Sequence, residues 1–176
     1  MLKRNLKKDK ILIIIPAYNE EESILSTYQS VMDYNKKDKP ISLDVMVIND
    51  GSKDDTKRIL KDNHIPHINL VHNLGIGGAV QTGYKYALET NYDYAVQFDG
   101  DGQHDISYVE TILKPLQKGQ ADLCIGSRFL DDTSEFKSTG ARRVGIKIIS
   151  FLIRLFAHIK IMDPTSGFRA ANRSVF

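Results

Sequence analysis

The segment Phe98-Asp99-Gly100-Asp101-Gly102-Gln103-His104 carries two carboxylates one residue apart, directly after a short apolar run. Two carboxylates at the end of a buried strand repel each other unless a cation lies between them. Asp99, Asp101 and Gln103 offer only oxygen ligands, which suit Mg²⁺ or Mn²⁺ better than zinc. The spacing therefore predicts a hard divalent cation, whose usual task is to bridge diphosphate oxygens and stabilise charge on a departing phosphate.

Two other interpretations of this loop stay open. The stretch from Asp99 to Glu110 follows much of the spacing of an EF-hand calcium loop, but position six is His104 instead of glycine and a strand precedes the loop. The loop is also similar to the nucleophile motif of haloacid-dehalogenase-type phosphatases, in which the first Asp is phosphorylated. That motif belongs near the start of a chain and needs a later acidic pair, which is not obvious here. A calcium-binding module and a phosphatase are therefore alternatives of a different class.

Polar and glycine-rich segments follow the earlier apolar runs as well. They are Pro16-Ala17-Tyr18-Asn19-Glu20-Glu21, Asn49-Asp50-Gly51-Ser52 and His72-Asn73-Leu74-Gly75-Ile76-Gly77-Gly78. Turns and helix caps explain such residues in any one loop, but four loops at one sheet edge favour a binding site. The glycines from Gly75 open a predicted helix, so backbone N–H groups could approach a phosphate. A dinucleotide-binding dehydrogenase is a weak alternative, because Val80 stands where that motif needs its third glycine.

Five short apolar runs position these loops, and each is bounded by polar or turn residues. The runs are Ile11–Ile15, Leu43–Ile48, Ile68–Val71, Tyr94–Phe98 and Ala121–Ile125. Continuous apolar character predicts strands that are covered on both faces, and the spacing leaves room for a helix after each strand. Helices are expected at Glu21–Asp33, Asp54–Asp62, Gly78–Glu89 and Ser107–Lys118, with capping boxes at Ser52-x-x-Asp55 and Ser107-x-x-Glu110. The predicted fold is α/β, a mostly parallel central sheet flanked by helices, with ligands beyond the carboxyl ends of the strands.

Composition excludes several classes of protein. The chain has 176 residues, 24 Lys+Arg against 22 Asp+Glu, and 41% hydrophobic residues, which fits one globular domain and excludes a disordered or fibrous chain. A single cysteine excludes a disulfide-rich secreted domain. The formal charge of +2 argues against nucleic acid as the main partner, because binding phosphates needs a concentrated basic face. No apolar stretch is long enough to cross a membrane.

The motifs taken together resemble the family 2 glycosyltransferases of the GT-A fold, which is Rossmann-like. The resemblance is greatest to the branch of dolichol-phosphate mannose synthase and the polyprenyl-phosphate sugar transferases. It rests on motifs that fall in the family's order along nearly the whole chain: Ile15-Pro-Ala-Tyr-Asn-Glu20, Ile48-Asn-Asp-Gly-Ser52, Asn73-Leu-Gly75, Phe98-Asp-Gly-Asp-Gly-Gln-His104, Gly126-Ser-Arg128 and Asp163-Pro-Thr-Ser-Gly-Phe-Arg169. It implies a basic N-terminal tail at 1–10 and a GT-A catalytic domain at 11–176 that is truncated at its C-terminus.

The resemblance also implies roles for single residues. The expected nucleotide-sugar-binding residues are Pro16, Ala17, Tyr18, Glu20, Asp50, Gly75, Asp99, Gly100 and Asp101. A carboxylate such as Asp50 can accept a hydrogen bond from an imino N–H of uracil or guanine, so UDP-, GDP- and dTDP-linked donors all stay open. The implied metal ligands are Asp99, Asp101 and Gln103, and the implied cofactor is Mg²⁺ or Mn²⁺.

The implied reaction is inverting transfer of a sugar to a polyprenyl phosphate, of the dolichyl or undecaprenyl type. Arg128, with Arg142 or Arg143, would hold the acceptor phosphate, because a guanidinium binds phosphate through two parallel hydrogen bonds. The expected catalytic residues are Asp163, Asp101 and Arg128. Asp163 would act as a base if the acceptor is a saccharide hydroxyl, which is the alternative of the same fold.

A basic stripe on the predicted helix from 143 to 159 suggests where the protein binds its acceptor. Arg143, Lys147, Arg154 and His158 fall on one narrow arc of that helix, and apolar residues occupy a wide arc of the remainder. Part of this apolar arc is expected to meet the membrane interface, where a long-chain lipid phosphate is found. The alternative is a core helix with a solvated cationic edge. The sequence therefore predicts a cytoplasmic protein that is peripheral at the cytoplasmic membrane face.

Overall fold

The computed structural model describes residues 9–37, 41–100, 105–126 and 166–176. Six residues with predicted roles lie outside these ranges: Asp101, Gln103, Arg128, Arg142, Arg143 and Asp163. The predicted basic helix at 143–159 also lies outside them.

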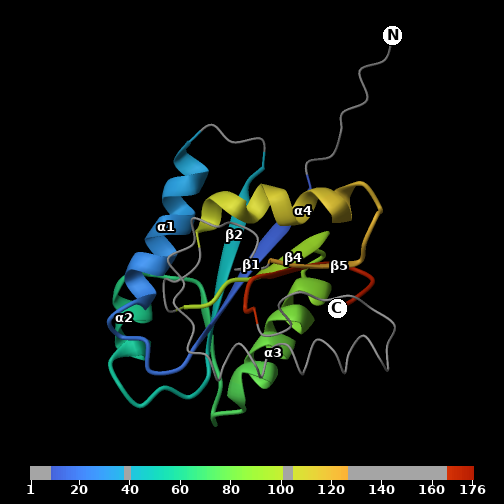
Figure 1. Ribbon diagram of the computed structural model, residues 1–176. Coiled ribbons are helices and arrows are strands. Elements are labelled where there is room, and N and C mark those ends of the chain that lie inside the picture. The colour runs from blue at the N-terminus through green and yellow to red at the C-terminus, as the bar shows by residue number, and fades with distance from the viewer. Residues whose placement is uncertain (1–8, 38–40, 101–104, 127–165) are drawn as a thin grey trace, which may run out of the picture.

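The described residues form a six-stranded sheet with the order β3-β2-β1-β4-β6-β5 (Figure 1). The strands are β1 (Ile11–Ala17), β2 (Leu43–Asn49), β3 (His67–Asn69), β4 (Tyr94–Gln97), β5 (Leu123–Ile125) and β6 (Arg169–Asn172). The pairs β1–β2, β1–β4 and β2–β3 are parallel, and β6 runs antiparallel to both β4 and β5. The predicted mostly parallel α/β sheet is confirmed, and each predicted apolar run contains a strand or overlaps one.

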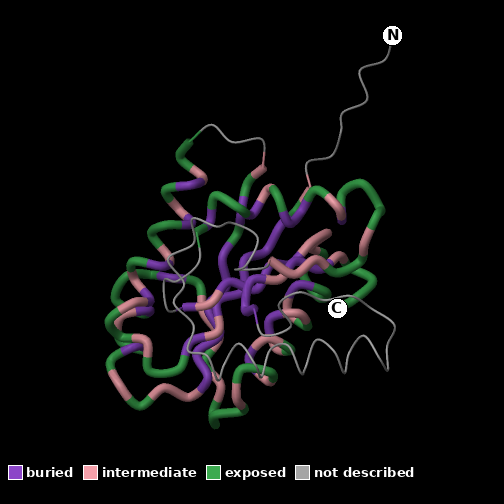
Figure 2. The backbone as a smooth tube through the Cα atoms, viewed as in Figure 1, coloured by how far each residue is buried: buried purple, intermediate pink, exposed green. Residues whose placement is uncertain are grey.

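Helices cover both faces of this sheet. The helices α1 (Ile24–Lys36) and α4 (Val109–Gln117) lie on one face, with α2 (Thr56–Asp62) beside α1, and α3 (Gly75–Glu89) lies on the other face (Figure 1). Ile11, Ile13 and Ile15 of β1 pack in the core cluster of α1 and α4, whereas Leu12 and Ile14 pack in the cluster of α3. Figure 2 shows the buried residues concentrated along the central strands. Burial on both faces explains why β1 is apolar at successive positions.

The strand β6 was not predicted. Its sequence Arg169-Ala-Ala-Asn172 contains no β-branched or aromatic residue, so it carries no local strand signal. Its position between β4 and β5 comes from pairing, with Ala95 opposite Ala171 and Cys124 opposite Ala170.

Both predicted capping boxes are wrong. The N-cap of α2 is Asp55, and the Ser52 hydroxyl accepts a hydrogen bond from the Asn19 N–H instead. Before α4, a short 3₁₀ turn at Ile106–Tyr108 is capped by Asp105, whose side chain accepts from the Ser107 N–H. Glu110 accepts a hydrogen bond from the Tyr34 hydroxyl on α1. In both places a side chain finds a tertiary partner that local spacing does not reveal.

The start of α3 also differs from the prediction. The helix begins at Gly75, three residues before the predicted start at Gly78, so the glycine cluster belongs to its first turn. Gly75 has a φ of 76°, a left-handed backbone conformation that glycine adopts without strain. The expected phosphate-facing loop is therefore the beginning of the helix itself.

Candidate functional site

Two loops that follow β1 and β2 are joined by hydrogen bonds at the carboxyl edge of the sheet. The Asn19 N–H donates to the Ser52 hydroxyl at 3.0 Å, and the Lys53 N–H donates to the Asn19 side-chain oxygen at 2.8 Å. The Glu20 N–H donates to the Thr56 hydroxyl at 2.9 Å. These bonds link residues more than 30 positions apart, so the two loops form one wall of the site.

Acidic side chains complete this connection. The Glu21 N–H donates to Asp54 at 3.1 Å, and the Asp55 N–H donates to Glu21 at 2.8 Å. Burial opposes ionisation of Asp54, but hydrogen bonds from Thr56 and Glu21 favour the carboxylate, and its pKa is lowered. The loop therefore carries an ionised Asp54 whose oxygens are already occupied by protein donors.

Asp50 is the buried carboxylate of the site. The residue is only 3% exposed, and its Oδ1 accepts from the Leu74 N–H at 2.7 Å. Its own N–H donates to the Ala17 carbonyl at 2.8 Å. Asp50 thus connects the loops after β1, β2 and β3, and one of its oxygens is fixed by the backbone just before α3. A buried carboxylate needs such donors, because an unpaired charge would be costly there.

A cavity of about 240 Å³ opens beside Asp50. Its described lining consists of Pro16, Ala17, Tyr18, Glu20, Asp50, Ile76, Ala79, Asp99 and Gly100. Seven of these residues were predicted as nucleotide-sugar-binding residues from three separate motifs, and the fold brings all seven together. Gly75 is the exception among the described candidates, because the first turn of α3 contributes Ile76 to the lining instead. Ile76 and Ala79 were missed, since apolar residues in a glycine-rich motif carry no chemical signal.

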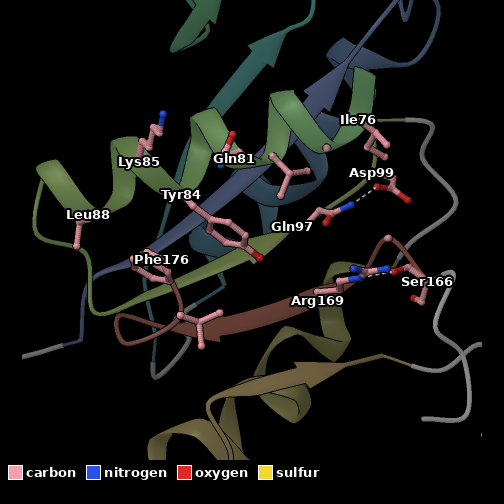
Figure 3. A pocket seen from close by; sticks show the side chains of 14 residues that line it. Ile76, Gln81, Tyr84, Lys85, Leu88, Gln97, Asp99, Ser166, Arg169 and Phe176 are labelled. Carbon is pink, nitrogen blue, oxygen red and sulfur yellow. Dashed lines mark hydrogen bonds between the residues drawn. The ribbon is translucent and has the colours of Figure 1, made fainter. Parts of the chain in front are cut away.

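Asp99 lies between this cavity and a larger one of about 670 Å³. The Gln97 amide donates to its Oδ1 at 3.2 Å, as Figure 3 shows. On another side the carboxylate packs against the backbone of Gly167, where an added Cβ would overlap its oxygens. Gln97 was missed because a glutamine in a buried strand looks like an ordinary strand residue, and Gly167 because its partner is distant in sequence.

The larger cavity extends from Asp99 along α3. Gln81, Tyr84, Lys85 and Leu88 of α3 form one wall in Figure 3, and Arg169 and Phe176 lie opposite. The Arg169 Nε donates to the Ser166 carbonyl at 2.8 Å. Burial raises the pKa of Tyr84 although the positive charge of Arg169 acts in the opposite direction, and the Tyr84 ring stacks on Phe176. The cavity is therefore polar near Asp99 and more apolar toward the end of α3.

The charges of the smaller cavity bear on the predicted metal. Glu20, Asp50 and Asp99 are the charged side chains in its described lining, and all three are acidic. A nucleoside diphosphate would be repelled there unless a cation compensates the charge. Within the described ranges no group of three His, Cys, Asp or Glu residues could hold a metal ion. The predicted ligands Asp101 and Gln103 lie outside those ranges, and the third predicted ligand, Asp99, lies at the carboxyl edge of the sheet and has the carboxylate oxygens that hard cations prefer.

Comparison with known proteins identifies the family. The model of glycosyl transferase family 2 matches residues 12–176, which include all the strands and loops described above except Ile11, the first residue of β1. The chain belongs to this family. This result favours the glycosyltransferase interpretation of the Asp99 loop over the phosphatase, calcium-binding and dehydrogenase alternatives.

Two curated relatives of this family 2 chain fall in the predicted branch. One is the UDP-N-acetylglucosamine–dolichyl-phosphate N-acetylglucosaminyltransferase of Methanococcus voltae, 32% identical, with 94% of this chain and 71% of the relative aligned. The other is the undecaprenyl-phosphate mannosyltransferase of Micrococcus luteus, 31% identical, with 92% of this chain and 65% of the relative aligned. The resemblance to the polyprenyl-phosphate sugar transferases is thereby confirmed.

A solved structure supports the fold. Glucosyl-3-phosphoglycerate synthase from Mycobacterium tuberculosis, in complex with Mn²⁺ and UDP-glucose, aligns with a TM-score of 0.68 and 22% identity over 95% of this chain. The family 2 chain has the GT-A fold, as predicted. It spans 57% of the length of that solved chain. Among the described helices none is both long and apolar enough to span a bilayer.

Proposed function

We propose that this chain carries the donor site and catalytic centre of a metal-dependent, inverting glycosyltransferase. The enzyme would move a sugar from a nucleotide-sugar donor to a polyprenyl phosphate. The observation that carries the proposal is the cavity beside Asp50, which collects seven predicted donor-binding residues from the end of β1 and from the loops after β1, β2 and β4.

The donor's nucleoside occupies the smaller cavity in this proposal. Asp50 keeps one oxygen on the Leu74 N–H and offers the other to an imino N–H of the base, as uracil, thymine and guanine present. Small residues at Ala17, Ala79 and Gly100 leave room for the nucleoside beside the sheet edge. The diphosphate then reaches Asp99, and the sugar extends toward the larger cavity, where Ser166 and Arg169 are polar.

The leaving group requires charge compensation. Sugar transfer passes through an oxocarbenium-like state while the anomeric carbon loses its nucleotide diphosphate. Asp99, Asp101 and Gln103 would hold Mg²⁺ or Mn²⁺, which would stabilise the negative charge of the departing diphosphate. Gln97 and Gly167 fix the Asp99 carboxylate from the side of the larger cavity, so that it does not have to reorient during the reaction.

The acceptor is inferred from the relatives, whose names specify dolichyl phosphate and undecaprenyl phosphate. A phosphate monoester is largely ionised near pH 7, so a phosphate acceptor needs no strong general base. Arg128, Arg142 and Arg143 are the proposed phosphate-binding residues. The proposed location is the membrane surface, because the acceptor is a lipid.

Thermal unfolding with a panel of nucleotides tests the donor part of the proposal. UDP, GDP, dTDP and CDP are added with and without Mn²⁺, because a ligand that binds the native state raises the unfolding temperature by mass action. We expect a shift with at least one of the imino-bearing nucleotides that increases when Mn²⁺ is present. No Mn²⁺-dependent shift with any of the four would contradict the proposal.

A further inference from the structure

A buried threonine on α1 reaches the backbone of the predicted metal loop. Thr27 is 2% exposed, and its hydroxyl donates to the Gly100 carbonyl at 3.0 Å. The two residues are 73 positions apart, and the hydrogen bond is buried. Ile24 and Val31 lie on the same buried face of the helix, so position 27 is one where an aliphatic side chain would otherwise be expected.

This hydroxyl behaves unlike its neighbours. Ser26 donates to the Ser23 carbonyl and Ser30 donates to the Thr27 carbonyl, both close by in the sequence. A helical Ser or Thr usually bonds to the carbonyl three or four residues earlier in its own helix. The Thr27 hydroxyl is instead directed across the helix–loop boundary to Gly100.

The orientation of the Gly100 carbonyl determines the orientation of the peptide unit that follows it. It belongs to the planar peptide unit whose nitrogen is that of Asp101, so a hydrogen bond to the oxygen orients the whole unit. Glycine restricts its own backbone less than any other residue, and without an external contact this peptide could rotate. On its other side Gly100 faces the Pro16 carbonyl, where an added Cβ would come within 3.1 Å. Gly100 is therefore held between the end of β1 and helix α1.

We propose that Thr27 is a positioning residue, which orients the Asp99–Gly100 backbone that leads to the predicted ligands of the divalent cation. This inference rests on the proposed function and adds a residue that touches neither the donor nor the metal. Its effect would be on the affinity for the cation, because the hydrogen bond fixes the Gly100 carbonyl next to Asp99 before the cation arrives. Asp50, the proposed partner of the base, lies on the loop after β2 and is held by the Leu74 N–H, so the change in metal-free nucleotide affinity should be the smaller of the two.

The test measures two affinities in one set of variants. Thr27→Val removes the hydroxyl while keeping the shape, Thr27→Ser restores a hydroxyl, and Ser30→Ala removes a neighbouring hydroxyl that bonds within α1. Mn²⁺ is titrated at fixed UDP by calorimetry and by electron paramagnetic resonance of free Mn²⁺, and UDP is titrated separately without metal. The unfolding temperature of each variant without ligand reports whether it folds, and Thr27→Ala replaces Thr27→Val if the latter does not.

We expect Thr27→Val to need about three- to tenfold more Mn²⁺, the effect of about one buried hydrogen bond, with metal-free UDP affinity within about twofold of wild type. Thr27→Ser and Ser30→Ala should match wild type in both titrations. Unchanged Mn²⁺ affinity in Thr27→Val would overturn the inference, and so would an equal loss in Ser30→Ala. If the wild-type protein does not bind UDP, the titrations are made with GDP or dTDP; if it binds none of the three with Mn²⁺, the proposed function fails and this inference fails with it.

Discussion

The Asp99 carboxylate packs directly against the backbone of Gly167, with no space for a Cβ at position 167. The contact brings the end of β4 against the residues that lead into β6, the antiparallel strand beside it. Because Asp99 lines both cavities, the position of Gly167 controls the position of the carboxylate at the point where they meet.

Gly167→Ala should therefore displace Asp99. The added methyl group would overlap the carboxylate, and relief of the overlap would move either the side chain or the backbone of position 167. We expect a loss of about 1–3 kcal/mol in the free energy of unfolding, as for other overpacked sites. Mn²⁺-dependent nucleotide binding should fall as well. Urea unfolding and a Mn²⁺ titration check the two effects, and wild-type values in both would show that the site tolerates the methyl group.

Gly83→Ala tests how closely α3 lies on the sheet. A Cβ at position 83 would overlap the fully buried Ile14 side chain of β1. We expect a loss of about 1–3 kcal/mol in the free energy of unfolding, although alanine is the better helix former. Gly77→Ala in the same helix is the control, because its Cβ meets no atom within 4 Å, and it should stabilise the protein by about 0.5–1 kcal/mol.

The double variant Gly83→Ala, Ile14→Ala separates the clash from other effects. Removal of the Ile14 side chain should cost about 2–5 kcal/mol in the wild-type background and clearly less in the Gly83→Ala background, since the new methyl group fills part of the space. Strict additivity of the two free-energy changes would contradict the close packing of α3 on β1.

Asp50→Asn should change which nucleobase is preferred. The asparagine oxygen can still accept from the Leu74 N–H, while the amide group replaces the second carboxylate oxygen with a donor. We expect UDP affinity to fall about 10- to 100-fold, the range for a lost hydrogen bond to a charged group. CDP, whose ring presents an acceptor at the corresponding nitrogen, should lose less or gain. Calorimetric titration of both nucleotides checks this, and a parallel loss for both would show that Asp50 does not contact the base.

Ionisation of Tyr34 should lower the free energy of unfolding at alkaline pH. Burial first, and then the 2.7 Å hydrogen bond to Glu110, raise the pKa of Tyr34 above its ordinary value. The pKa of Tyr34 is higher in the folded protein than in the unfolded chain. The stabilisation of the folded state by protonated Tyr34 is therefore complete below about pH 10, where unfolded tyrosine titrates, and is lost as the pH rises further. Between pH 10 and 11 the wild-type protein should lose about 1 kcal/mol more stability than Tyr34→Phe. Equal slopes of unfolding free energy against pH would contradict this.

The features that could be predicted from the sequence are those that depend on short local patterns of apolar or polar residues. The run Ile11–Ile15 predicted a strand covered on both faces, and β1 packs against both helical layers. The polar segments after β1, β2 and β4 predicted one site, and Tyr18, Glu20, Asp50 and Asp99 from these segments line one cavity. Parallel strands place their carboxyl ends at the same edge, so order along the chain was enough for this prediction.

The remaining features depend on contacts between distant segments. The β6 sequence has no strand propensity, and its place follows from pairing with β4 and β5. The partners of Ser52 and Glu110 are Asn19 and Tyr34, which no helix-start pattern reveals. Thr27 did leave one signal, because it is a polar residue on the apolar face that Ile24 and Val31 define.

Sugar transfer to a lipid phosphate tests the central claim most directly. The protein is incubated with Mn²⁺, a polyprenyl phosphate and radiolabelled nucleotide sugars of the UDP, GDP and dTDP series, and the lipid is extracted into organic solvent. The account predicts radiolabelled glycosyl lipid from at least one donor, and its loss when Mn²⁺ is chelated or in Asp99→Asn. No labelled lipid from any donor would contradict it.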